Sequence, residues 1–172
     1  DYINSVAETS DGGYIVGGPF ASESIDLGDE ISLANAKSGY SDGMVIKYGS
    51  RGEVEWAKGI GGTSDDCITS VSETTDGGYI VGGYFGSSSI NLGNGVSLSN
   101  NGSSGSKDGM IIKSGSSGEV EWAKGIGGME NDEITSVSEA TDGGYIVGGY
   151  FRSGSIDLGN GVSLANAKSG YS

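Results

Sequence analysis

The chain has 172 residues, of which 35 are Gly, one is Pro and none is His. Its 9 Lys and Arg face 23 Asp and Glu, so the net charge is −14, which disfavours binding to the phosphates of nucleic acids. The lack of His excludes His-based catalysis and His-ligated zinc, the single Cys excludes an internal disulfide, and no apolar run is long enough for a membrane span.

A repeat organises the whole sequence. The segment Asp-Gly-Gly-Tyr-Ile-Val-Gly-Gly occurs at 11–18, 76–83 and 142–149. This spacing predicts one region, 1–172, with about 2.6 units of about 66 residues. The units run approximately over 1–65, 66–131 and 132–172, the last being incomplete.

Each unit is predicted to consist of strands, and no window has a helical period. The predicted strands, in chain order, are Tyr2–Glu8 in the first unit and then Met110–Lys113, Glu119–Ile126, Ile134–Glu139 and Tyr145–Phe151. We predict that the last four form one antiparallel ladder. Asp-Gly predicts two-residue turns in which both central residues have positive φ. A Gly/Ser/Asn-rich excursion follows the ladder, and its Asn160-Gly161 pair predicts a hairpin turn.

Repeated four-stranded units favour an all-β fold made of β-propeller-type blades. Gly148 and Gly149 at the end of the most apolar strand would let neighbouring backbones approach closely. Trp56 and Trp122, one in each repeat, would fill the space between neighbouring sheets. A linear β-solenoid or a sandwich of stacked hairpins is the alternative.

The motifs resemble a known family. In order they are Asp-Gly-Met-Ile-Ile-Lys, Ser-Gly-Glu-Val-Glu-Trp-Ala-Lys, Gly-Gly-x-x-x-Asp and Asp-Gly-Gly-Tyr-Ile-Val-Gly-Gly. This succession is similar to the seven-bladed β-propeller repeat of bacterial surface and secreted proteins. The resemblance implies an extracellular or cell-surface location in a bacterium, and it implies no catalytic residues.

Acidic residues recur after Gly-Ile-Gly-Gly in two units. Asp65, Asp66, Glu130 and Asp132 could supply oxygen ligands to Ca²⁺, which prefers six to eight of them. The alternative is an acidic, solvated turn, because neither stretch has the spacing of a known calcium loop. Calcium is therefore the one cofactor that we consider, and no other is expected.

A variable loop over 29–41, 94–107 and 160–172 carries the candidate ligand contacts, because the one insertion and the sharpest sequence difference fall there. Tyr40 and Tyr171 could stack on sugar rings, and Asn100 and Asn101 occupy the middle copy of the loop. Cys67 is expected to be a tolerant position and not a nucleophile, since its counterparts are Tyr2 and Glu133.

These features predict a non-catalytic repeat scaffold that mediates adhesion, or binding of a glycan or a surface protein, through its variable loops. A lectin-like propeller and a fragment of a glycan-active propeller enzyme are the alternatives. The expected partners are further blades of the same parent chain or, less favoured, other copies of this chain that complete a ring. Neither a nucleic acid nor a membrane span is expected.

Overall fold

The computed structural model describes residues 1–102 and 105–167, and within them the protein is all-β, with no helix. No helix that could cross a membrane occurs in this part of the chain. The strands of the first unit are β1 (Ser5–Glu8), β2 (Tyr14–Phe20), β3 (Ser24–Asp26), β4 (Ser32–Ala34), β5 (Asp42–Tyr48) and β6 (Val54–Ile60). Those of the second are β7 (Asp66–Glu73), β8 (Tyr79–Phe85), β9 (Ser89–Gly93), β10 (Val96–Ser99), β11 (Asp108–Ser114) and β12 (Val120–Ile126). The third unit contributes β13 (Asp132–Glu139), β14 (Tyr145–Phe151), β15 (Ser155–Gly159) and β16 (Val162–Ala165).

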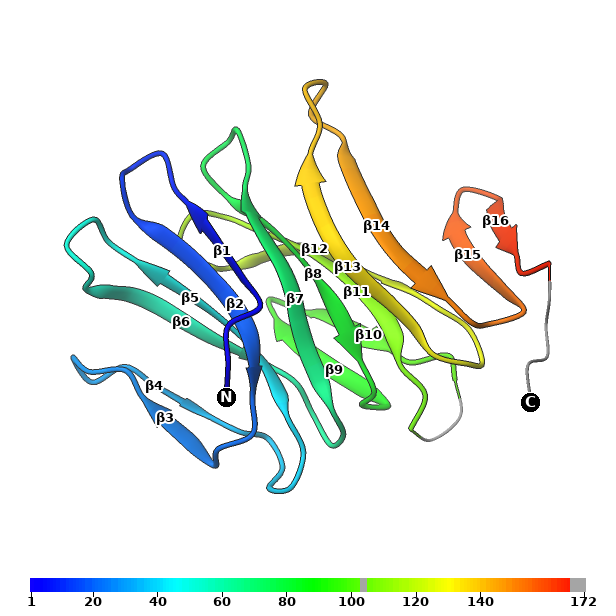
Figure 1. Cartoon of the computed structure of the whole chain (residues 1–172), viewed down its shortest axis with the longest axis horizontal. Helices are drawn as coiled ribbons and strands as arrows, with labels where there is room; N and C mark the ends of the chain where they lie inside the picture. Colours follow the sequence, from blue (N-terminus) through cyan, green and yellow to red (C-terminus); the bar gives the residue numbers. More distant parts are fainter. Residues whose placement is uncertain (103–104, 168–172) are drawn as a thin grey trace.

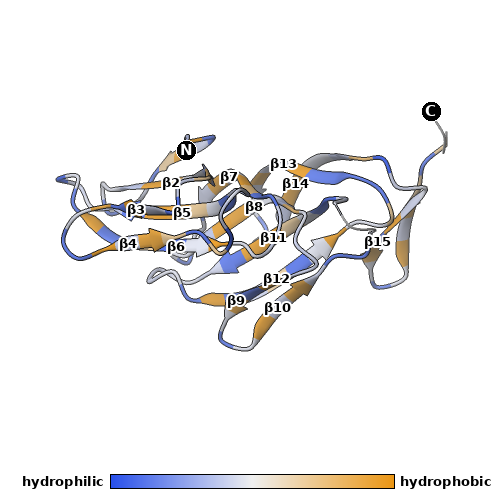
Figure 2. Ribbon diagram, turned by 90° about the horizontal axis from the view of Figure 1, so that it is seen from below, coloured by the Kyte–Doolittle hydropathy of each residue, from blue (hydrophilic) through white to orange (hydrophobic). Residues whose placement is uncertain are grey.

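The strands form antiparallel sheets of two or four strands. The first unit has the order β1-β2-β5-β6, and the second has the equivalent order β7-β8-β11-β12. β13 pairs with β14, while β3–β4, β9–β10 and β15–β16 are separate hairpins. Figure 1 shows the units following one another along the long axis, and Figure 2 shows the hydrophobic residues concentrated on the strands. The sheets of the described residues do not close into a ring.

The predicted strands are confirmed, and so is the antiparallel pairing of β11 with β12 and of β13 with β14, but the predicted continuation of the ladder from β12 to β13 is wrong. β11 pairs with β12 on one side and with the earlier strand β8 on the other, so β12 is an edge and does not continue to β13. The Gly/Ser/Asn-rich excursion lies inside the four-stranded unit as the hairpin β9–β10 and returns the chain beside β8. β13 starts a new layer instead, because Ile134 and Val137 pack on the face of the second sheet.

The Asp-Gly turns also differ from the prediction. Gly12 has φ +81°, whereas Asp11 is not in the positive-φ region. The amide of Gly12 donates to the carbonyl of Thr9, and the amide of Thr9 donates to Gly13, which defines a three-residue loop with one left-handed glycine. The Asp11 carboxylate accepts from the Gly13 amide at 2.9 Å and so holds this turn. By contrast, the predicted Asn160-Gly161 turn is confirmed, with both φ values positive.

Glycine allows the sheets to stack closely. A Cβ at Gly17 would lie 2.6 Å from Cγ2 of Ile68 and 2.7 Å from Cγ1 of Val71, which belong to the next sheet. Gly82 has the same relation to Val137 and Ile134, where the two distances would be 2.6 and 3.0 Å. Contacts shorter than 3.0 Å are essentially never made by a real Cβ, so the next sheet packs closely at Gly17 and Gly82 because these residues have no side chain.

Aromatic pairs complete these junctions. Trp56 meets Tyr79 of the next sheet edge-on with ring centroids 5.6 Å apart, and Trp122 meets Tyr145 in the same way. The indole NH of Trp56 also donates to the carbonyl of Ser116. The predicted placement of tryptophan between sheets is thus confirmed.

Candidate functional site

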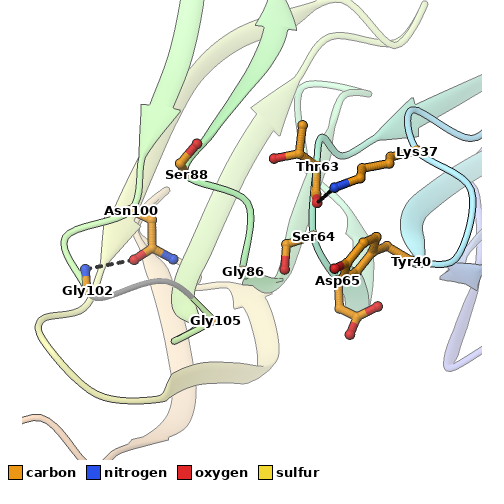
Figure 3. A pocket seen from close by; sticks show the side chains of 10 residues that line it. All are labelled: Lys37, Tyr40, Thr63, Ser64, Asp65, Gly86, Ser88, Asn100, Gly102 and Gly105. Atoms are coloured by element: carbon orange, nitrogen blue, oxygen red, sulfur yellow. Dashed lines mark hydrogen bonds between the residues drawn. The ribbon is translucent and has the colours of Figure 1, made fainter.

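A polar cleft of about 630 Å³ lies between the first and second units (Figure 3). One wall is the loop before β5, the floor is the connection from β6 to β7, and the other wall comes from the segments that flank the β9–β10 hairpin. The lining residues are Lys37, Tyr40, Thr63, Ser64, Asp65, Gly86, Ser88, Asn100, Gly102 and Gly105. The fold therefore brings together three of the predicted site residues, Tyr40 and Asp65 from the first unit and Asn100 from the second.

Tyr40 offers an aromatic ring at the cleft. Its side chain is 37% exposed, and the Lys37 ammonium lies 4.8 Å from the ring centroid. Lys37 also donates to the carbonyl of Thr63, across the cleft floor. The loop is shaped by Asn35, whose amide nitrogen donates to the carbonyls of Phe20 and Tyr40. The Lys37 ammonium thus lies over one face of the Tyr40 ring at the cleft.

Asp65 joins the connection between β6 and β7 to the loop before β5 at the cleft floor. One carboxylate oxygen accepts from the Ser41 amide at 3.0 Å and from the Ser41 hydroxyl at 3.2 Å. The residue is exposed, so its carboxylate also faces the solvent of the cleft. Asn131 replaces it at the next junction and accepts from the Lys107 amide.

Asn100 lies on the cleft wall, but its side chain makes hydrogen bonds within its own unit. The amide nitrogen donates to the carbonyls of Phe85 and Ser106, and the oxygen accepts from the Gly102 amide. Asn35 makes the equivalent bond to Phe20, so this Asn shapes the loop in both units. The side chain of Asn101 is exposed, and its backbone amide donates to Asp108. Tyr171 lies outside the described residues.

The four candidate calcium ligands have unlike environments. Asp66 and Asp132 are buried, and each accepts hydrogen bonds from its own chain: Asp66 from the Gly62 amide and from Ser87, Asp132 from the Gly128 amide and from Ser153. Asp65 and Glu130 are exposed. Among the residues that the structure describes, no three acidic or Cys side chains gather closely enough to hold a metal. Calcium binding stays a prediction.

Two further acids were missed by the sequence reasoning. Asp42 and Asp108 begin β5 and β11 and are 2% and 0% exposed. One oxygen of each accepts from a loop amide, and the other, Oδ1, has no hydrogen-bond partner. Burial raises the pKa of both carboxyls, and burial also raises the pKa of Asp66, to about 6. The recurrence of Asp before Gly-Met was the signal for these positions.

Buried lysines are a second feature that was missed. Lys47 is 1% exposed and donates to Asp11 at 2.9 Å and to the carbonyl of Tyr48. Lys113 is 2% exposed and pairs with Asp76 at 3.0 Å. The sequence signal for these lysines was their position after the apolar residues of the Asp-Gly-Met strand, because such a strand is expected to be buried. Because the pairs recur, they are part of the framework.

Cys67 is buried, and it accepts a weak hydrogen bond from Asn4. Burial raises the pKa of its thiol, which opposes formation of the reactive thiolate. This environment agrees with the expectation that Cys67 is not a nucleophile.

Comparison with known proteins gives a partial likeness. No family model matches the chain. The Regulatory protein FlaEY of Caulobacter vibrioides is 29% identical over 115 residues, which are 67% of this chain and 12% of that protein. The likeness therefore concerns a small part of the relative.

Proposed function

We propose that this chain is a non-catalytic binding scaffold of stacked, propeller-type blades, located on the surface of a bacterium or secreted by it. The observation that carries the proposal is the cleft between the first two units, where Tyr40, Lys37 and Asp65 converge. Its volume of about 630 Å³ is in the range of small-ligand sites. A ring for stacking with adjacent charged donors and acceptors suits a sugar, and the ligand class that we favour is a glycan.

The blade arrangement is supported by the way in which the junctions repeat. The junctions at Gly17 and Gly82 use equivalent residues, so each successive sheet has a similar relation to the one before. Identical heterologous contacts generate a ring when the rotation closes. A regular rotation of this kind underlies a propeller.

A catalytic role is less well supported. Glycoside hydrolysis generally requires two carboxyl groups that flank the bond. Among the described residues that line the cleft, Asp65 is the single acid. The name of the Caulobacter relative describes a regulatory protein.

A glycan array tests the ligand class. We expect the intact chain to bind a limited set of glycans and Tyr40→Ala to lose at least tenfold in affinity for them, because the stacking surface is removed. Tyr14→Ala is the matched control, since Tyr14 is 46% exposed on β2 and does not line the cleft. Absence of glycan binding, or equal loss in both variants, would contradict the proposed ligand class.

A further inference from the structure

β8 and β14 have the same sequence but different neighbours. Both read Tyr-Ile-Val-Gly-Gly-Tyr-Phe, at 79–85 and 145–151. β8 lies between β7 and β11, whereas β14 pairs with β13 alone among the described residues. Figure 1 shows the β13–β14 pair at the end of the stack, next to the hairpin β15–β16. The free edge of β14 presents the backbone groups that β8 uses to bind β11.

An apolar cavity of about 430 Å³ adjoins this edge. Its lining includes eight apolar residues: Ile126, Ile134, Tyr145, Val147, Phe151, Ile156, Leu158 and Leu164. Each has a counterpart 66 residues earlier, and all eight counterparts belong to one core cluster that spans the first and second units. The same cluster also contains Met110, Ile112 and Val120 from β11 and β12, together with Ile15, Val45 and Val71. The cavity is therefore lined by the counterparts of residues that share a core cluster with Met110, Ile112 and Val120 in the second unit.

The edge of β14 also has an acidic residue placed to pair with a lysine of a docked strand. Asp11 and Asp76 each hold a buried lysine that ends the neighbouring strand, Lys47 and Lys113 respectively. Asp142 is their counterpart, and it already has the turn geometry of the pair, because its carboxylate accepts from the Gly144 amide at 3.0 Å as Asp76 does from Gly78. Asp142 therefore lies where a lysine at the end of a docked strand would meet it.

We propose that the edge of β14 and its cavity form a docking site for a β-hairpin of the repeat type. The occupant carries Asp-Gly-Met, an apolar residue, Ile and Lys on its first strand and Glu-Val-Glu-Trp on its second. Its first strand extends the sheet beside β14, its Met and Ile enter the cavity, and its Lys pairs with Asp142. This is recognition by strand addition, in which the backbone provides affinity and side-chain pockets provide specificity. The site is separate from the polar cleft and does not depend on the glycan proposal.

A synthetic peptide of residues 107–127 tests the proposal in trans. We expect saturable binding to the intact chain, a higher thermal midpoint, and amide chemical-shift changes concentrated in β14 and β15. The peptide of residues 42–60 contains the equivalent hairpin of the first unit and should bind comparably. A peptide with Met110→Ser and Ile112→Ser should lose at least tenfold in affinity.

Exchanging the charges of Lys113 in the peptide and Asp142 in the chain tests whether the peptide pairs with β14 in the proposed register. The Lys113→Glu peptide should bind the native chain weakly and should regain affinity for the Asp142→Lys chain. The Asp142→Asn chain, which keeps an acceptor for Gly144, should bind the native peptide less tightly than the native chain does. The proposal is overturned if the native peptides bind no better than a scrambled one, or if exchange brings no rescue. It is also overturned if the chain self-associates through β14 and the peptide does not dissociate the complex.

Discussion

The substitution Gly82→Ala tests whether bare backbone is required between sheets. A Cβ at Gly82 would lie 2.6 Å from Cγ1 of Val137 and 3.0 Å from Cγ2 of Ile134. Val137 is β-branched and 5% exposed, so it has little freedom to rotate away. Overpacking of this kind costs about 1–3 kcal/mol of unfolding free energy.

Gly148→Ala provides the control, because Gly148 has the same position in the same seven-residue sequence. The nearest atom to its Cβ would be Cβ of Ser136, at 3.8 Å, an ordinary contact. Alanine in a strand is favoured over glycine by roughly 0.5–1 kcal/mol, so this variant should be neutral or more stable. The difference between the two variants then isolates the steric effect, about 1–3 kcal/mol.

Urea unfolding, followed by tryptophan fluorescence and by hydrogen exchange in β8 and β13, measures this difference. Hydrogen exchange is needed because stacked repeats can unfold unit by unit. Gly17→Ala should behave like Gly82→Ala, because its Cβ would meet Ile68 and Val71 as closely. If Gly82→Ala and Gly148→Ala differ by less than about 0.5 kcal/mol, close stacking over glycine is not what joins the sheets.

The remaining predictions concern a turn, a buried acid and a metal. Glu30 has φ +64° where the other units have Gly95 and Gly161, so Glu30→Gly should stabilise the chain by about 0.5–1 kcal/mol in urea unfolding, and a loss of stability would contradict this. Because the pKa of Asp66 rises from 3.8 to about 6 on folding, the folded state binds more protons between these values. Stability should therefore fall as the pH increases from about 4 to 6, by roughly 3 kcal/mol in total, and Asp66→Asn should remove this part of the pH dependence. Calorimetry with and without a chelator tests the calcium prediction: a bound structural ion should give a lower unfolding midpoint with the chelator, and an unchanged midpoint would mean that Asp66 and Asp132 are held by the chain's own donors alone.

The strands and several turns were predictable because their causes are local. Alternation in Glu-Val-Glu-Trp places β12, and the run Tyr145–Phe151 coincides with β14. The three-residue form of the Asp-Gly turns was not predictable from Asp-Gly alone, since it depends on the Asp11 carboxylate, which accepts from the Gly13 amide within the turn and from Lys47 of the neighbouring strand β5. The site was predictable in part: Tyr40, Asp65 and Asn100 line one cleft, but their convergence depends on how two units pack.

The sequence by itself determined an all-β chain with a repeat of about 66 residues, because alternation and turn chemistry act over a few residues and recur with the repeat. Only the tertiary structure decided that β11 pairs with β8, and that β13 begins the next layer. The reason is that strand pairing depends on contacts between residues far apart in the sequence, which local patterns do not specify. Ile134 and Val137 pack over Gly82 of the preceding sheet, while Lys113 becomes buried beside Asp76 within one sheet, and both contacts join residues that are distant in sequence.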